Sequence, residues 1–283
     1  MSIRQIFHVA VAALLPFVGA IVPAHAQGKL EAHYSASLAG LPVGKGNWVV
    51  NIGDSTYTAV ASGVTTGLMR VLTGGQGTTS ARGTLSAGRP VLATYSATIK
   101  TSRKTDEVLM TVNEGQVKDI KLSPSVVPDP QRIPVTDAER SGVIDPMTAS
   151  LLRVPGTGAV VSSDACQRSI AVFDGRLRYN LKLAFKRMDT VTAGRGYTGS
   201  VVVCSVSFTP IAGFVPTRYV VKYLAEQREM EVWLAPIAGT RVLVPFRFET
   251  PTPVGAVVME ATEFVTGTTA PAAPAAAKGV KTQ

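Results

Sequence analysis

The residue types that carry most acid–base and metal chemistry are scarce in this sequence. It contains three histidines, and two of them, His8 and His25, fall in an N-terminal segment with the features of a removable leader. His33 alone remains, so we expect no metal site and no mechanism that needs two histidines. A Ser-His-Asp triad would have to use His33 without the Gly-x-Ser-x-Gly turn that presents the serine, and a histidine on a surface strand is the plainer interpretation.

The chain has two cysteines, Cys166 and Cys204, about 38 residues apart. In an oxidising compartment an even pair of cysteines is expected to form a disulfide, and neither thiol is then available as a nucleophile. A pair of buried free thiols is the alternative. A redox site is disfavoured, because the cysteines lack the Cys-x-x-Cys spacing.

Four carboxylates are candidates for the paired acid and base of a hydrolase: Asp145, Asp174, Glu229 and Glu231. Each has a plainer structural role. Asp145 precedes a proline as a helix N-cap, Asp174 precedes Gly175 in a turn, and the two glutamates alternate along one strand face. The sequence therefore favours a protein without enzymatic activity, and a hydrolase of envelope material is a further alternative.

Basic and aromatic side chains supply the candidate ligand or partner contacts. Arg176, Arg178 and Lys182 alternate along one strand, so they form a basic face that can meet a carboxylate or phosphate. The alternative is an outward face that pairs with acids of a neighbouring strand. Trp233 is a further candidate contact, and both Trp48 and Trp233 could stack on a ligand, although a half-buried strand tryptophan more often belongs to the core.

The N-terminus has the three parts of a secretory signal: Arg4, an apolar run over residues 6–22, and the small-x-small sequence Ala24-His25-Ala26. We predict cleavage after Ala26 and a periplasmic protein without a transmembrane segment; an uncleaved anchor is the alternative. The formal charge of +9 suggests attraction to anionic envelope surfaces, or a basic face kept for solubility. With 6% aromatic residues and no interleaving of aromatic and basic residues, no nucleic-acid binding is expected.

Turn signals recur every 8–12 residues and separate segments of strand character, which predicts an all-β fold. We expect about 10–12 antiparallel strands in a large curved sheet or an incomplete β-barrel. An alternating segment follows Asp174-Gly175, the dipeptide that tolerates positive φ at both turn positions. Strands are expected at residues 30–41, 47–52, 56–61, 78–85, 90–100, 107–113, 117–122, 218–224, 229–234, 242–249 and 256–265, with a turn at 42–46.

A proline-rich crossing over residues 123–142 interrupts the strands and leads to one short helix, predicted over residues 146–153. Asp145 is its N-cap and Pro146 its first residue. Because so short a helix is unstable alone in water, it must dock on the sheet. We expect a signal peptide at 1–26, one domain at 27–266 and a disordered Pro/Ala-rich tail at 267–283.

The order of these motifs resembles the family of exported bacterial proteins known as domain of unknown function 3108 (DUF3108). The motifs are Leu-Pro-Val-Gly at 41–44, Asp145-Pro146, Phe-Asp-Gly-Arg-Leu-Arg-Tyr at 173–179 between the cysteines, Trp-Leu-Ala at 233–235 and Val244-Pro245. The resemblance implies a periplasmic all-β protein and brings no catalytic residue or cofactor. The size and pattern also resemble envelope lipoprotein carriers, in which short helices cover an unclosed half-barrel.

Two functional hypotheses follow. In the first, the concave apolar face of the sheet holds an amphiphile such as a lipid or another envelope component. In the second, the protein is an envelope scaffold or assembly factor that contacts a protein partner or an anionic surface without a small ligand. A carrier should contain an apolar cavity of several hundred Å³, whereas a scaffold should have a filled core and an exposed patch.

Overall fold

The structure is a computed structural model that describes residues 28–67, 69–70, 74–86 and 89–268. The expected leader with its cleavage site, and most of the expected tail, lie outside the described residues. Within them, fifteen strands form one sheet, more than the ten to twelve expected. Two of the additional strands, β8 (Leu152–Arg153) and β11 (Arg195–Gly196), are two residues long and carry no sequence pattern.

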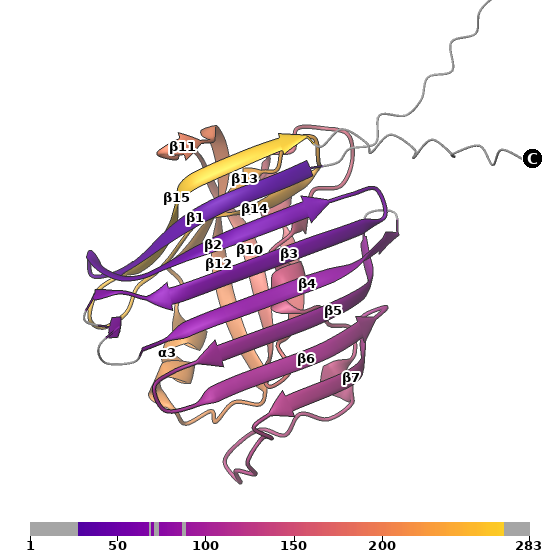
Figure 1. Ribbon diagram of the computed structural model, residues 1–283, viewed down its shortest axis with the longest axis vertical. Coiled ribbons are helices and arrows are strands. Elements are labelled where there is room, and N and C mark those ends of the chain that lie inside the picture. The colour runs from indigo at the N-terminus through magenta and orange to yellow at the C-terminus, as the bar shows by residue number, and fades with distance from the viewer. Residues whose placement is uncertain (1–27, 68, 71–73, 87–88, 269–283) are drawn as a thin grey trace, which may run out of the picture.

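The first half of the chain is an antiparallel meander in which each strand pairs with the next. Its strands are β1 (Gly28–Leu38), β2 (Leu41–Ile52), β3 (Thr56–Thr65), β4 (Gln76–Ser86), β5 (Arg89–Lys100), β6 (Thr105–Asn113) and β7 (Gln116–Ser123). In Figure 1 these strands form the layer nearest the viewer.

The second half continues the same sheet from β1. Its remaining strands are β9 (Arg168–Phe173), β10 (Arg178–Thr192), β12 (Thr198–Ala212), β13 (Met230–Pro236), β14 (Val242–Thr250) and β15 (Val257–Thr268). The sheet order runs β7-β6-β5-β4-β3-β2-β1-β15-β14-β13-β12-β10-β9, and Figure 1 shows β10 and β12 crossing behind the first layer. The predicted curved antiparallel sheet is confirmed, and it does not close.

A short connecting segment bridges the gap between the edge strands β7 and β9. The Val143 N–H donates to the carbonyl of Gly115 in the β6–β7 turn, at 3.0 Å. The next residue, Ile144, donates to Ala171 of β9 and accepts from Phe173, both at 3.0 Å. These bonds occupy backbone groups that an open edge would expose to other chains.

The proline-rich crossing is held to the rest of the fold at its start and at its middle. At its start the Arg176 guanidinium donates to the carbonyl of Pro124, at 2.8 Å. Further along, Ile133 exchanges backbone hydrogen bonds with Gly213 and Phe214, just after β12. The crossing also contains the 3₁₀ helix η1 (Ala138–Arg140).

Three local predictions were wrong. The expected helix over 146–153 is only α2 (Pro146–Ala149), because β8 then pairs with β14. The expected strand at 218–224 is helix α3 (Tyr219–Glu226), where packing against β12 overrides the strand preference of two adjacent valines. The expected turn at 42–46 lies inside β2, and Ala39-Gly40 makes the turn instead, with positive φ at both residues.

In the turn between β9 and β10, Asp174 and Gly175 do not both adopt the positive φ that the dipeptide would tolerate. The Asp174 carboxylate accepts from the backbone N–H groups of Arg176 and Leu177, at 2.8 and 2.7 Å. Only Gly175 of the dipeptide has a positive φ, +97°. A Cβ at this glycine would lie 2.6 Å from Cγ1 of Val108 on β6, so the turn also needs its lack of a side chain.

Replacing Gly175 with alanine is therefore expected to lower the free energy of unfolding by about 2 kcal/mol, from backbone strain and the contact with β6. Urea denaturation measures the change. Gly158→Ala is the control, because a Cβ there would meet no atom within 4 Å and its backbone needs no positive φ. Equal stabilities of the two variants would contradict the close approach of the turn to β6.

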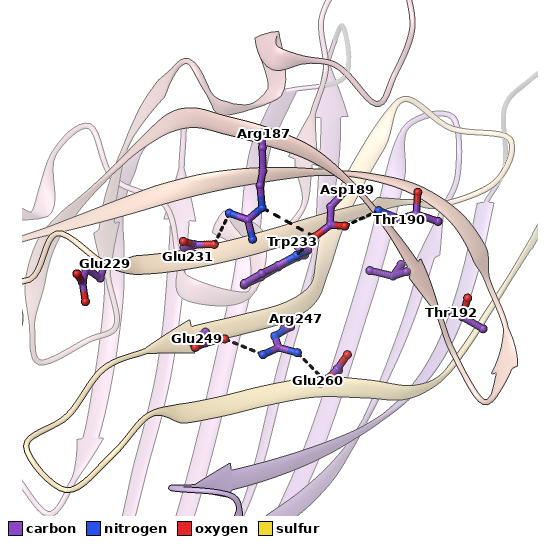
Figure 2. A pocket seen from close by; sticks show the side chains of 11 residues that line it. Arg187, Asp189, Thr190, Thr192, Glu229, Glu231, Trp233, Arg247, Glu249 and Glu260 are labelled. Atoms are coloured by element: carbon purple, nitrogen blue, oxygen red, sulfur yellow. Dashed lines mark hydrogen bonds and ion pairs between the residues drawn. The ribbon is translucent and has the colours of Figure 1, made fainter.

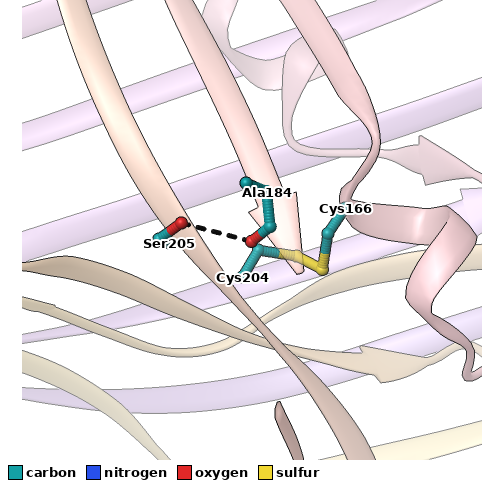
Figure 3. The surroundings of a disulfide bond; sticks show 4 residues. All are labelled: Cys166, Ala184, Cys204 and Ser205. Carbon is teal, nitrogen blue, oxygen red and sulfur yellow. Dashed lines mark hydrogen bonds between the residues drawn. A yellow bond between two sulfur atoms is a disulfide. The ribbon is translucent and has the colours of Figure 1, made fainter. Parts of the chain in front are cut away.

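The buried side chains form two cores. The first joins β1–β6 to β12–β15 and includes Met147 of α2. The second lies between β10, β12–β14 and the segment 152–166, which ends in the 3₁₀ helix η2 (Ser163–Cys166). The expected disulfide between Cys166 and Cys204 is present in the second core and ties η2 to β12 (Figure 3).

Candidate functional site

Two of the basic side chains singled out in the sequence, Arg178 and Lys182, lie on one face of β10, because they are four residues apart in a regular part of the strand. Arg176 lies in the β9–β10 turn and binds the crossing, as described above. Arg178 donates to the carbonyl of Tyr179 and to Oδ1 of Asn180, at 2.6 and 2.8 Å. Lys182 is exposed on β10. The two arginines thus support the backbone and side chains of their own chain, and neither lies with Trp233.

Trp233 instead lies in a polar cleft of about 530 Å³, which we call the Trp233 cleft. The guanidinium carbons of Arg187 and Arg247 lie 5.3 and 5.0 Å from the centroid of its ring. Figure 2 shows them on either side of the indole, whose N–H donates to Asp189 at 3.0 Å. Such cation–π contacts hold the ring in place. The cleft is lined by Arg187, Asp189, Thr190, Val191, Thr192, Glu229, Glu231, Trp233, Arg247, Glu249 and Glu260.

The charges of the Trp233 cleft pair with one another. Arg187 contacts Glu231 at 2.8 Å, and Arg247 contacts Glu249 and Glu260 at 2.7 and 3.1 Å. Partial burial raises the pKa of Glu231, but hydrogen bonds from Lys186 and Arg187 outweigh it and leave that pKa below its ordinary value. A general acid needs a raised pKa, so the environment of Glu231 suits an ion pair better than proton donation.

A second hollow is apolar and lies on the buried face of β1–β3. We call it the Trp48 cavity; its volume is about 400 Å³. Met147 and Ser150, from α2 and the residue after it, line its other side together with Pro245 and Met259. The β1–β3 lining residues are Tyr34, Ser35, Ala36, Gly44, Lys45, Gly46, Asn47, Trp48, Ala61, Ser62, Gly63 and Val64.

The cavity exists because the buried face of the sheet changes from large to small side chains. On β2 the buried face carries Ile52, Val50 and Trp48, and the same alternation then reaches Gly46 and Gly44. The small residues align across the strands, since Gly46 pairs with Gly63 of β3 and Gly44 pairs with Ala36 of β1. Aligned glycines leave space that larger side chains fill elsewhere in the first core.

Two polar side chains border this apolar surface, and both are buried. The Tyr34 hydroxyl donates to the carbonyl of Pro245 at 2.7 Å, and burial raises the pKa of Tyr34, which keeps the phenol neutral. The Trp48 side chain is 7% exposed, and its indole N–H has no acceptor within the described residues. A buried donor without a partner costs about 1–3 kcal/mol. The indole nitrogen has no accessible surface, so Trp48 contributes the apolar part of its ring to the cavity lining.

Sequence reasoning missed this cavity. It considered Trp48 as a possible ligand-stacking residue but favoured a core position, and it expected residues 42–46 to form a turn. The available signal was the alternation Gly44-x-Gly46-x-Trp48 followed on the next strand by Ala61-x-Gly63, which places the small residues on one face.

The remaining carboxylates have structural roles. Asp145 is the N-cap of α2 and accepts from the Thr148 N–H at 2.9 Å, and Pro146 occupies the first turn. Burial raises the pKa of both Asp145 and Asp174 against the opposing effect of their hydrogen bonds. Among the described residues, no group of three or more His, Cys, Asp or Glu side chains is placed to hold a metal ion, and no helix is long and apolar enough to cross a membrane.

The sequence profile described as "Protein of unknown function (DUF3108)" matches residues 31–262. The chain belongs to this family. The match covers both hollows and the disulfide of this DUF3108 protein. A search of curated proteins finds no match. Among solved structures, the chain is similar to "Beta-barrel-like Protein of Domain of Unknown Function DUF1849 from Brucella abortus", with 11% identity, a TM-score of 0.47, and coverage of 84% of this chain and 98% of that chain.

Proposed function

We propose that this DUF3108 protein is a non-enzymatic periplasmic protein that binds an amphiphile in the Trp48 cavity. The observation that carries the proposal is an apolar cavity of about 400 Å³ lined by Tyr34, Trp48 and Met147. That volume lies in the range of small-molecule sites. The ligand class that fits has an apolar chain for the cavity and a polar head near Lys45, the charged residue of its lining.

Other observations support an exported, non-enzymatic role. A disulfide persists in oxidising compartments, and the leader-like N-terminus in the sequence agrees with such a location. The hydrolase alternative would need two convergent carboxylates, one of them with a raised pKa. In the Trp233 cleft, Glu231 and Asp189 both have lowered pKa values, the latter chiefly through the hydrogen bond from Trp233.

Native mass spectrometry of the mature protein, purified without detergent, tests the proposal. A reproducible adduct that solvent extraction identifies as lipid-like is the expected result. A clean mass without adduct, repeated after incubation with envelope lipids, would contradict ligand binding and favour the scaffold alternative.

Two substitutions locate the site, with displacement of a fluorescent long-chain fatty acid as the measurement. Ala36→Phe should fill the cavity and weaken binding at least about tenfold. Trp48→Phe should weaken binding roughly three- to fivefold, because it removes part of the apolar ring surface that lines the cavity. Val60→Phe is the matched control, because Val60 is half exposed on the opposite face of β3. If all three variants keep the affinity of the parent protein, any ligand binds elsewhere.

A further inference from the structure

Three turns meet where the Trp48 cavity opens. The Ala39 N–H of the β1–β2 turn donates to the carbonyl of Ala256, next to the β14–β15 turn, at 2.8 Å. The segment after β3 joins them, because the Thr66 N–H donates to the carbonyl of Val43 at 2.9 Å. We call this surface, made of residues 38–45, 64–67, 69–70 and 250–259, the cavity rim. In Figure 1 the β1–β2 and β14–β15 turns lie at the same edge of the molecule.

The rim exposes large apolar side chains at the tips of its turns. Leu41 is 70% exposed and Val254 69% exposed. Val64 and Met259 are also exposed and line the cavity itself. Apolar surface therefore continues from the turn tips into the cavity, and neighbouring exposed apolar residues mark interaction sites more often than scattered ones do.

The charges of the rim have one sign. Its three segments contain Lys45 and Arg70 and no aspartate or glutamate, and the whole chain carries a formal charge of +9. Lys45 also lines the cavity. Glu249 and Glu260, directly outside the third segment, are both paired with Arg247. Apolar tips beside Lys45 and Arg70 suit an anionic lipid surface, because the tips enter the acyl region while the cations meet the headgroups.

We propose that the cavity rim docks on an anionic lipid bilayer, with Leu41 and Val254 inserted and Lys45 and Arg70 at the headgroups. This inference deepens the proposed function and rests on it. If the rim docks, the cavity opens toward the membrane that supplies or receives its amphiphile. The docking itself needs no bound ligand.

Vesicle co-sedimentation of the full mature protein tests the docking. We expect binding to vesicles that contain phosphatidylglycerol, weaker binding to vesicles of phosphatidylcholine alone, and a further loss at high salt. The variant Leu41→Ser/Val254→Ser should bind anionic vesicles roughly tenfold more weakly. Lys45→Gln/Arg70→Gln should also weaken binding roughly tenfold and remove most of its salt dependence.

Matched control variants distinguish vesicle binding through the rim from nonspecific adsorption of the protein to vesicles. Val127→Ser changes a valine that is 75% exposed on the proline-rich crossing, and Lys182→Gln changes an exposed cation on β10. Both should bind vesicles as the parent protein does, with unchanged melting temperatures in all variants. No binding to anionic vesicles, or equal losses in rim and control variants, would overturn the docking.

The docking and the ligand proposal fail separately. Leu41→Ser/Val254→Ser should keep its lipid-like adduct in native mass spectrometry, whereas Ala36→Phe should lose the adduct and still dock. An adduct without vesicle binding refutes only the docking. Vesicle binding without any adduct refutes only the cavity ligand.

Discussion

Cys166→Ser is expected to lower the free energy of unfolding by roughly 3–4 kcal/mol under oxidising conditions. The disulfide joins residues 38 apart in sequence, and opening a loop of that size restores this much conformational entropy to the unfolded chain on the loop-closure model. Both cysteines are fully buried in the second core. The segment that carries Cys166 packs on β12 and β10, so its loss should also loosen that core.

Urea denaturation with and without a thiol reductant measures this effect. The reductant should destabilise the parent protein and leave the variant unchanged. Cys166→Ala/Cys204→Ala is the control for the buried hydroxyl of serine, because alanine removes the bridge without adding a polar group to the core. If the parent protein unfolds at the same urea concentration with and without reductant, the disulfide does not stabilise the fold.

Local patterns in the sequence predicted the parts of the fold that depend on local chemistry. Period-two alternation identified most strands of the meander, and Asp145-Pro146 identified the start of α2. The two cysteines predicted their own pairing. For the strands and the start of the helix, the residues that carry the signal lie within a few residues of the element that they predict. For the disulfide, the sequence offers each cysteine a single possible partner.

Contacts between distant segments were not predictable in this way. The bridge of Val143 and Ile144 between β7 and β9 depends on how far the sheet curls. The parallel pairing of β11 with β15 depends on the β10–β12 hairpin folding back. β12 is buried on both faces, with Val201 and Val203 in the first core and Val202 and Cys204 in the second, so its apolar run shows no alternation.

The candidate site was missed for a related reason. Charge and aromatic content drew attention to Arg176, Arg178, Lys182 and Trp233. The structure uses the two arginines and the tryptophan in separate local contacts, and Lys182 is exposed. A cavity is a shortage of side-chain volume, and it becomes visible only when the register places Gly44, Gly46 and Gly63 side by side. Residue chemistry alone does not show that alignment.

Asp145→Ala is expected to lower the free energy of unfolding by about 2–4 kcal/mol. Asp145 is fully buried and accepts from both the backbone N–H and the hydroxyl of Thr148. The Thr148 hydroxyl also contacts the Tyr57 hydroxyl at 2.6 Å, which links α2 to β3. Alanine removes a helix cap and leaves buried donors without their acceptor, and each loss costs about 1–2 kcal/mol.

Asp145→Asn is the matched control, because its amide keeps the shape and one oxygen acceptor for the Thr148 N–H. Its NH₂ group can donate to the Thr148 hydroxyl, which can in turn donate to Tyr57. We therefore expect asparagine to cost less than half as much as alanine. Equal losses for the two variants would mean that the hydrogen bonds of Asp145 do not stabilise α2.

The stability of the parent protein relative to Asp145→Asn should also depend on pH. Burial raises the pKa of Asp145 in the folded state, whereas the unfolded value is about 3.9. Between these values the folded chain holds a proton that the unfolded chain has lost, so stability falls as pH rises. The parent should be most stable relative to asparagine below about pH 4 and lose that advantage as pH rises through the folded pKa. Urea denaturation from pH 3 to 7 measures the difference, and the opposite slope would show that the hydrogen bonds from Thr148 outweigh burial.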